Sequence, residues 1–277
     1  MKISVFTHMR EPEKRMDPWE EALKCYESIT DEVVVVGQDV EEEFRWNKLG
    51  QMFQEGFEKC TGDWVINLSV DMFLHQKDIN KLIEFIKKYP EEPALTLPKY
   101  KFFEPNRFEI KNFETIIFNK KLFSDIQFNG GGDLALPTLN GQVLDQSNIK
   151  YSNIPLWNYD TTFRTKEVIA KDRSRFARAW FREFNDYGDR GGPTNEEAFD
   201  AWFTMIKERY PLHTNKINVS NHPEFILGKL KSLKKEQFGF DLFGLKHSTS
   251  FTIKQKIASG TKKNLKSFLH LEPDIKK

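Results

Sequence analysis

Apolar residues in the first third of the chain alternate between short unbroken runs and stretches with helical spacing. The unbroken runs are residues 3–6, 33–36 and 64–68, and the β-branched character of the second favours a buried strand. Apolar positions recur every three or four residues in 19–29 and 49–60, which predicts helices. Asp78 then predicts the N-cap of a third helix. This alternation predicts a parallel sheet with right-handed crossovers.

The pattern is less regular from residue 91 onward. Strands are predicted at 94–97 and 115–118, long helices at 165–184 and 195–210, and a shorter helix opening at His222-Pro223. The last 40 residues lack strong periodicity. The simplest division is therefore a catalytic domain over residues 1–227 and a basic C-terminal extension over residues 228–277.

Charge is distributed unevenly, although the whole chain carries a net charge of only +1. The segment 228–277 has 12 lysines, no arginine and four acidic residues, so it carries +8 and the remainder carries −7. Such a tail suits a surface that meets phosphates, anionic lipid or a partner, and a solvated helical tail explains it equally well. The acidic body and the lack of a nucleic-acid-binding motif argue against nucleic acid as a partner.

The two cysteines and the N-terminus indicate the compartment. Cys25 and Cys60 fall on the apolar faces of predicted helices, where free thiols behave as small hydrophobes, and this favours a reducing compartment. The chain opens on a strand-like segment rather than on the apolar run of a signal peptide, and no stretch is apolar enough to span a membrane. We therefore expect a cytoplasmic protein.

Polar residues follow each of the three predicted strands, and open parallel sheets bind ligands at that edge. Thr7 and Arg10 follow the first strand, Asp39 follows the second and Asp71 follows the third. Arg10 suits a phosphate, and Asp39 suits a base or ribose as an acceptor. Ordinary roles are the alternatives: a salt bridge of Arg10 with nearby glutamates, and turn aspartates. Asn47 and Lys48 open the next helix, near its positive end.

Several segments in this order resemble the family 2 glycosyltransferases. The matching pieces are residues 4–7, 31–37 and 62–71, followed by three that fit a subgroup whose third strand ends in Ala-Asp-Glu: 70–78, Gly132-Asp133-Leu134 and His222-Pro223. The resemblance covers residues 2–90 well and extends thinly to about residue 230. It implies an α/β, GT-A-like nucleotide-diphospho-sugar transferase fold, with a mainly parallel central sheet flanked by helices and a helical C-terminal extension.

The metal motif departs from the family pattern. The usual Asp-x-Asp reads Ser69-Val70-Asp71 here, and Met72 stands where the subgroup commonly has Glu. The resemblance therefore implies Mn or Mg held weakly by Asp71, donor phosphates and water. A histidine from the C-terminal part often completes such sites in this fold, which makes His222 the candidate second ligand. A helix-start residue ahead of proline is the alternative explanation for His222.

The resemblance implies a transfer reaction, in which an acceptor hydroxyl attacks the anomeric carbon of a nucleotide sugar and a nucleoside diphosphate leaves. An inverting enzyme needs a general base for that hydroxyl. Asp133, in a glycine-rich loop, is the first candidate and Asp160 is the second, although either also fits a turn aspartate. Positive charge for the leaving diphosphate is offered by a helix face with Arg175, Arg178 and Arg182. That face equally fits a solvated surface paired with Glu167, Asp172 and Glu183.

The expected donor is thus a nucleotide sugar, and the expected acceptor is a glycan or lipid-linked glycan. The basic tail adds the expectation of peripheral contact with the anionic inner face of a membrane. Loss of the first metal carboxylate leaves one alternative open: a nucleotide-sugar-binding module of the same fold with impaired catalysis.

Overall fold

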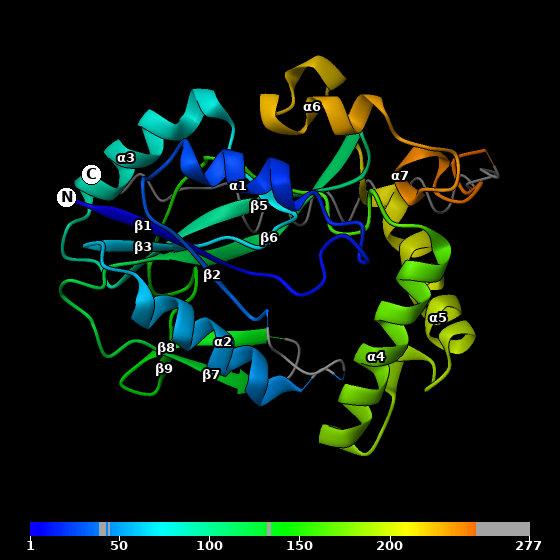
Figure 1. The fold of residues 1–277 in the computed structure, drawn as a ribbon, viewed down its shortest axis with the longest axis horizontal. Helices are drawn as coiled ribbons and strands as arrows, with labels where there is room; N and C mark the ends of the chain where they lie inside the picture. The colour runs from blue at the N-terminus through cyan, green and yellow to red at the C-terminus, as the bar shows by residue number, and fades with distance from the viewer. Residues whose placement is uncertain (39–42, 44, 132–133, 248–277) are drawn as a thin grey trace.

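The computed structural model describes residues 1–38, 43, 45–131 and 134–247. A nine-stranded sheet forms its centre (Figure 1). The strands lie in the order β2 (Val33–Val36), β1 (Ile3–His8), β3 (Trp64–Asn67), β6 (Arg107–Phe118), β5 (Ala94–Glu104), β11 (Leu156–Asn158) and β4 (Met72–Phe73), with β10 (Lys150–Tyr151) beside β5 and β12 (Asn215–Lys216) beside β6.

The first three strands run parallel, as the alternating pattern predicts. Phe6 of β1 is paired with Val34 on one side and with Asn67 on the other. Strands β10 and β11 are also parallel to β5, whereas β6 runs antiparallel to both β3 and β5. The expected GT-A-like α/β fold is confirmed, with antiparallel pairing added in the second half of the sheet.

The two strands predicted at 94–97 and 115–118 pair with each other at the open end of one long hairpin, away from its turn. Strands β5 and β6 contain 11 and 12 residues. The middle of the hairpin carries charged side chains, such as Lys99, Lys101 and Glu109, which are nevertheless buried. Charges at buried positions hide the apolar pattern, so the sequence predicts only the apolar ends.

Helices cover both faces of the sheet (Figure 1). One face carries α1 (Trp19–Glu27), α3 (Ile79–Lys88) and α6 (Glu224–Lys231). The other carries α2 (Trp46–Lys59) and a small sheet of β7 (Gln127–Gly131), β8 (Leu134–Leu139) and β9 (Gln142–Val143). Phenylalanines fill this second core: Phe6, Phe57, Phe118 and Phe128 meet edge to face there.

A third layer of helices stands at the far end of the β5–β6 hairpin (Figure 1). It consists of α4 (Lys166–Phe184), α5 (Asn195–Arg209) and α7 (Phe238–Asp241), packed around Phe103, Ile169, Trp202 and Phe238. The Thr165 hydroxyl caps α4 by accepting from the Val168 amide, and Thr194 forms a capping box with Glu197 on α5. Short 3-10 turns lie at η1 (Gln76–Asp78), η2 (Gly188–Arg190), η3 (Tyr210–Leu212) and η4 (Val219–Asn221).

The described part of the basic extension packs on the body. Helix α6 runs across position 228 and buries Ile226 and Leu230 in the first core, while Phe238 and Leu242 are buried in the third. Asp78 precedes α3 as predicted, but its carboxylate pairs with Lys81 at 2.7 Å instead of capping the helix. Within the described residues, no helix combines the length and the apolar character needed to cross a membrane.

Candidate active site

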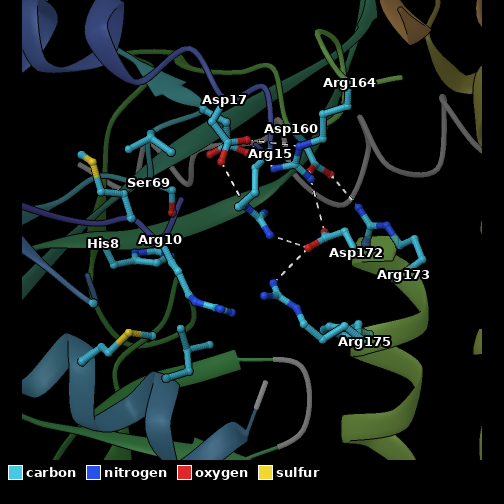
Figure 2. A pocket seen from close by; sticks show the side chains of 17 residues that line it. His8, Arg10, Arg15, Asp17, Ser69, Asp160, Arg164, Asp172, Arg173 and Arg175 are labelled. Atoms are coloured by element: carbon cyan, nitrogen blue, oxygen red, sulfur yellow. Dashed lines mark hydrogen bonds and ion pairs between the residues drawn. The ribbon is translucent and has the colours of Figure 1, made fainter. Parts of the chain in front are cut away.

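A cavity of about 320 Å³ opens at the carboxyl ends of β1, β2 and β3 (Figure 2). Residues that follow the three strands line the cavity, together with Leu49 and Met52 of α2. Residues of α4 line the opposite wall. Its charged and polar lining is His8, Arg10, Arg15, Asp17, Ser69, Asp71, Asp160, Arg164, Asp172, Arg173 and Arg175. The position is the one at which open α/β sheets bind ligands.

Asp71 lies in the turn between β3 and β4, and neighbouring elements fix this turn. The Met72 amide donates to the Ser69 carbonyl at 2.7 Å, and the Tyr26 hydroxyl donates to the same carbonyl at 2.6 Å. The Asn158 side-chain amide donates to the Asp71 carboxylate at 3.0 Å. Burial, together with the nearby charges of Asp160 and Asp17, raises the pKa of Asp71. A positive charge placed near Asp71 would thus stabilise its ionised form.

Asp160 has the opposite electrostatic setting. Its carboxylate accepts from the Lys101 ammonium at 2.7 Å, and Arg173 and Arg164 follow at 3.5 and 3.9 Å. Burial by itself raises the pKa of Asp160, but Lys101, Arg173 and Arg164 together hold it well below its usual range. Asp160 is therefore a firmly ionised group that organises cations.

A buried ion-pair cluster joins the loop after β1 to α4. The Arg164 guanidinium donates to Asp17 at 2.6 and 3.1 Å and to Asp172 at 3.3 Å. Arg15 completes the cluster by donating to Asp172 at 2.5 Å and to Asp17 at 3.0 Å (Figure 2). Burial opposes the ionisation of Asp172, yet Arg15 and Arg164 hold its pKa below the usual range. These interactions fix the shape of the cavity wall.

Other arginines of the wall have looser ion pairs. Arg10 lies 3.5 Å from Glu11, and Arg173 lies 3.5 Å from Asp160. The Nε atom of Arg173 is buried without a hydrogen-bond partner among the described residues. Figure 2 shows Arg10 and Arg175 extending into the same space from opposite sides of the cavity. The cavity that Asp71 also lines therefore offers guanidinium groups to an anionic ligand.

The structure brings together three of the residues predicted from the sequence: Arg10, Asp71 and Asp160 all line the cavity. Thr7 is buried within β1 and does not line it. Lys48 is exposed on α2, whose Leu49 and Met52 reach the cavity instead. Asn47 lies in the first turn of α2, and Asp39 and Asp133 lie outside the described residues.

His222 does not line the cavity, and its ring nitrogens have other partners. Its Nδ1 atom lies 2.7 Å from the Tyr159 hydroxyl, and its Nε2 atom lies 2.5 Å from the Pro105 carbonyl oxygen. The ring is buried beside Phe102 and Trp157. This arrangement supports the structural explanation for His222, because a metal ligand needs one nitrogen directed at the ion.

The described residues do not form a complete metal site. No group of three His, Cys, Asp or Glu side chains among them is arranged to hold a metal ion. Asp160 and Asp17 are committed to arginine and lysine partners, which leaves Asp71 as the carboxylate open to a cation. One carboxylate supplies few of the oxygen ligands that Mg or Mn prefers.

The helix face of Arg175, Arg178 and Arg182 is divided between two roles. Arg175 lines the cavity and donates to Asp172 at 3.0 Å, whereas Arg178 and Arg182 donate to Glu43 at 2.6 and 3.1 Å. The helical spacing of α4 predicts that the three arginines share a face. It cannot show that Glu43, far away in the sequence, pairs with two of them.

Sequence reasoning missed Asp17, Arg15 and Arg164 as parts of the site. Asp17 and Arg164 are 147 positions apart and meet only through the tertiary fold. Asp17 directly precedes the N-cap of α1, and Arg164 directly precedes the N-cap of α4. An Asp is common near a helix start, and nothing in either local sequence shows that the two residues meet.

A model of the glycosyl transferase family 2 matches residues 39–139. No curated protein matches the chain in sequence. Among solved structures, S. aureus TarS is 13% identical with a TM-score of 0.39, over 95% of this chain and 55% of that one. S. aureus TarS 1-349 in complex with UDP is 13% identical with a TM-score of 0.37, over 99% of this chain and 93% of that one.

A third solved structure, a CMP:2-keto-3-deoxy-manno-octonic acid synthetase complexed with CTP, is 13% identical with a TM-score of 0.27, over 44% of this chain and 76% of that one. These structural likenesses are distant, so the assignment rests on the family match. That match runs from the loop after β2 through Asp71 and the β5–β6 hairpin to β8, and includes the Asp71 end of the cavity. The chain therefore contains a glycosyl transferase family 2 segment over residues 39–139, set within a GT-A-like fold.

Proposed function

We propose that this protein transfers a sugar, with inversion, from a nucleotide-sugar donor to a hydroxyl group of a glycan or lipid-linked glycan. One observation carries the proposal: Asp71 and five arginines line one cavity at the ends of β1, β2 and β3. Its volume of about 320 Å³ lies within the usual range for small-molecule sites. The S. aureus TarS structures with UDP and with UDP-GlcNAc are consistent with a donor of this class.

The proposed task of the arginines is to bind the donor diphosphate. Arg10 and Arg173 suit this task because their ion pairs, at 3.5 Å, are long enough to be exchanged for phosphate contacts. Arg15 and Arg164 hold the wall in place through Asp17 and Asp172. Guanidinium groups fixed before the reaction stabilise the negative charge that develops on the leaving diphosphate.

The general base is proposed to be Asp133. The acceptor hydroxyl gives its proton to this carboxylate while its oxygen bonds to the anomeric carbon. The bond from that carbon to the phosphate oxygen breaks, and the nucleoside diphosphate leaves with the electron pair. Asp160 is the weaker candidate, because Lys101 and Arg173 keep its pKa far below neutrality and thus make it a poor proton acceptor.

A divalent ion is part of the proposal in a limited way. Asp71 is the described residue that would hold Mn or Mg, together with donor phosphates and water. Such an ion supplies positive charge to the diphosphate. The raised pKa of Asp71 fits this role, because a neighbouring cation relieves the repulsion from Asp160 and Asp17.

The test is a thermal-shift screen with nucleoside diphosphates and nucleotide sugars, with and without Mn, followed by a transfer or hydrolysis assay on each ligand that raises the melting temperature. Ligands that bind the folded state stabilise it. We expect at least one nucleotide sugar to bind and to be turned over. Binding without turnover of any donor would instead identify the chain as a binding module, which the Ser69 and Met72 neighbours of Asp71 favour.

The basic extension is proposed to hold the enzyme at the anionic inner face of a membrane, from the cytoplasmic side. Its support is the net charge of +8 over residues 228–277. Flotation with anionic and neutral liposomes tests this. Binding that does not depend on anionic lipid or that resists high salt would contradict it.

A further inference from the structure

Two consecutive residues of α1 hold the turn between β3 and β4 and the short strand after it. The Tyr26 hydroxyl donates to the Ser69 carbonyl at 2.6 Å and also lies 3.1 Å from the Met72 carbonyl oxygen. The neighbouring Cys25 thiol lies 3.5 Å from the Leu74 carbonyl oxygen. Helix α1 thus contacts three carbonyl oxygens of one short segment, from 43 to 49 positions away in the sequence.

The phenol of Tyr26 is suited to this contact because it is buried and keeps its proton. Its ring is fully shielded from solvent in the first core, where the apolar face of α1 packs. Burial, together with the charges of Cys25 and Asp71, raises the pKa of Tyr26 well above its ordinary value. At neutral pH the hydroxyl therefore has a proton to donate. Phenylalanine at this position would fill the same space and leave the Ser69 carbonyl to the Met72 amide.

The carboxylate of Asp71 needs support because its charge is repelled where it stands. Burial raises the pKa of Asp71, and the charges of Asp160 and Asp17 raise it further. The ionised group therefore favours a place farther from these carboxylates and nearer to water. Asn158 restrains the side chain by donating to it at 3.0 Å, while Tyr26 restrains the main chain of the same turn. Loss of either donor would let the carboxylate shift.

We propose that Tyr26 is a positioning residue for Asp71: its hydroxyl holds the turn so that the carboxylate keeps the orientation that the donor requires. The part of this inference that concerns the donor rests on the proposed function. Tyr26 is not among the residues that line the cavity, so it would affect donor binding only through the turn.

Calorimetry on Tyr26→Phe tests the proposal, with Mn present and with whichever of UDP, GDP or CDP gives the largest thermal shift. Tyr210→Phe is the matched control, because it also deletes a buried hydroxyl, one that donates to Glu104 at 3.1 Å in the β5–β6 hairpin. Both variants should lower the melting temperature. We expect the Kd of the nucleotide to rise about fivefold in Tyr26→Phe and to change by less than about twofold in Tyr210→Phe.

A double-mutant cycle with Asp71→Asn shows whether Tyr26 acts through Asp71. If it does, adding Tyr26→Phe to Asp71→Asn should change the Kd by less than about twofold. Urea unfolding of the same four proteins gives a second readout that needs no ligand. Asp71→Asn should stabilise the Tyr26→Phe protein less than it stabilises the wild type, because a carboxylate released from its place has already regained water.

Two results would overturn the proposal. Additive effects of the two substitutions in urea unfolding would show that Tyr26 does not hold Asp71 in place. An equal loss of nucleotide affinity in Tyr26→Phe and Tyr210→Phe would show that a buried hydroxyl supports the fold in general and not this turn. If no nucleotide binds to the wild type but urea unfolding still couples Tyr26 to Asp71, then the donor assignment fails while the positioning role stands.

Discussion

Asn158 donates a 3.0 Å hydrogen bond to the carboxylate of Asp71, across 87 positions of sequence. The Tyr159 amide also donates to the backbone carbonyl of Asp71, at 2.9 Å. The last residue of β11 and the residue after it therefore hold the side chain and the main chain of Asp71, in the turn between β3 and β4. This carboxylate, which lines the cavity, is thus fixed in orientation before any ligand arrives.

Asp71→Asn should lose activity and gain stability. Replacing the carboxylate removes the proposed partner of the metal ion or donor, so kcat should fall about 100-fold or more. Because burial and Asp160 raise the pKa of Asp71, its charge opposes folding at neutral pH. The variant should therefore be more stable than the wild type at neutral pH, with a higher melting temperature. Asp31→Asn, at an exposed position before β2, is the control. Retained activity in Asp71→Asn would remove Asp71 from the mechanism.

Arg173→Gln should weaken donor binding. Loss of one charge-assisted phosphate contact raises the Kd of the nucleoside diphosphate about tenfold. Arg178→Gln is a matched control on the same helix, because Arg178 pairs with Glu43 and does not line the cavity. Calorimetry on both variants gives the comparison. Equal losses in the two would mean that α4 acts through its overall charge and not through the cavity.

Asp133 and Asp160 should respond differently to removal of their charge. Asp133→Asn removes the proposed base and should lower kcat about 10²–10⁴-fold. Asp160→Asn removes the carboxylate that positions Lys101 and Arg173, so its main effect should be on the KM for the donor. Steady-state kinetics of both variants over a range of pH decide the matter. A large kcat loss confined to Asp160→Asn would exchange the two roles.

The buried pair of Asp17 and Arg164 should behave as a unit in stability. Each side chain is about 5% exposed or less, so removing either partner leaves a buried charge with fewer ion pairs: Asp17 keeps Arg15, and Arg164 keeps Asp172. Arg164→Met or Asp17→Asn alone should cost about 1–3 kcal/mol in the free energy of unfolding. The double variant should recover part of that loss, and urea unfolding of the four proteins measures the coupling. Strict additivity would show that the pair is not energetically linked.

Buried histidines should make the protein sensitive to acid. Burial lowers the pKa of His222 and of His8 to about 4, and that of His213 to about 2. These values lie below the ordinary value in the unfolded chain, near 6.5. The stabilisation that the fold gains from keeping these histidines neutral is therefore complete above about pH 6.5. As the pH falls toward 4, the free energy of unfolding drops by about 1.4 kcal/mol per pH unit for each histidine. The raised pKa of Asp71 acts in the opposite direction.

His222→Gln should reduce the pH dependence of stability by one histidine's share, whereas the exposed control His247→Gln should not. Denaturant unfolding between pH 7 and pH 5 measures it. The same variant also checks the metal assignment: since both ring nitrogens have protein partners, its requirement for Mn should match that of the wild type.

The sequence predicts elements well where burial and apolar character coincide. The four valines of β2 and the helical spacing of α2 are examples, and Arg10 and Asp71 followed because parallel strands end at one edge. The middle of β5 is harder to predict from the sequence, because Lys99 and Lys101 are buried charges paired with Glu114 and Asp160. The Asp17–Arg164 pair depends entirely on how α4 approaches the loop after β1. No local pattern encodes that approach.

The start of the basic extension is joined to the site by the backbone. The Phe238 amide donates to the Arg164 carbonyl at 2.9 Å, the Gly239 amide donates to the Thr162 carbonyl at 2.8 Å, and the Gln237 side chain donates to the Phe163 carbonyl at 2.6 Å. These residues brace the segment that carries Arg164. A deletion that begins at Gly228 would thus cut a structural support of the cavity wall, and its loss of activity would say nothing about membranes. A deletion that begins after His247 keeps the brace and separates the two effects.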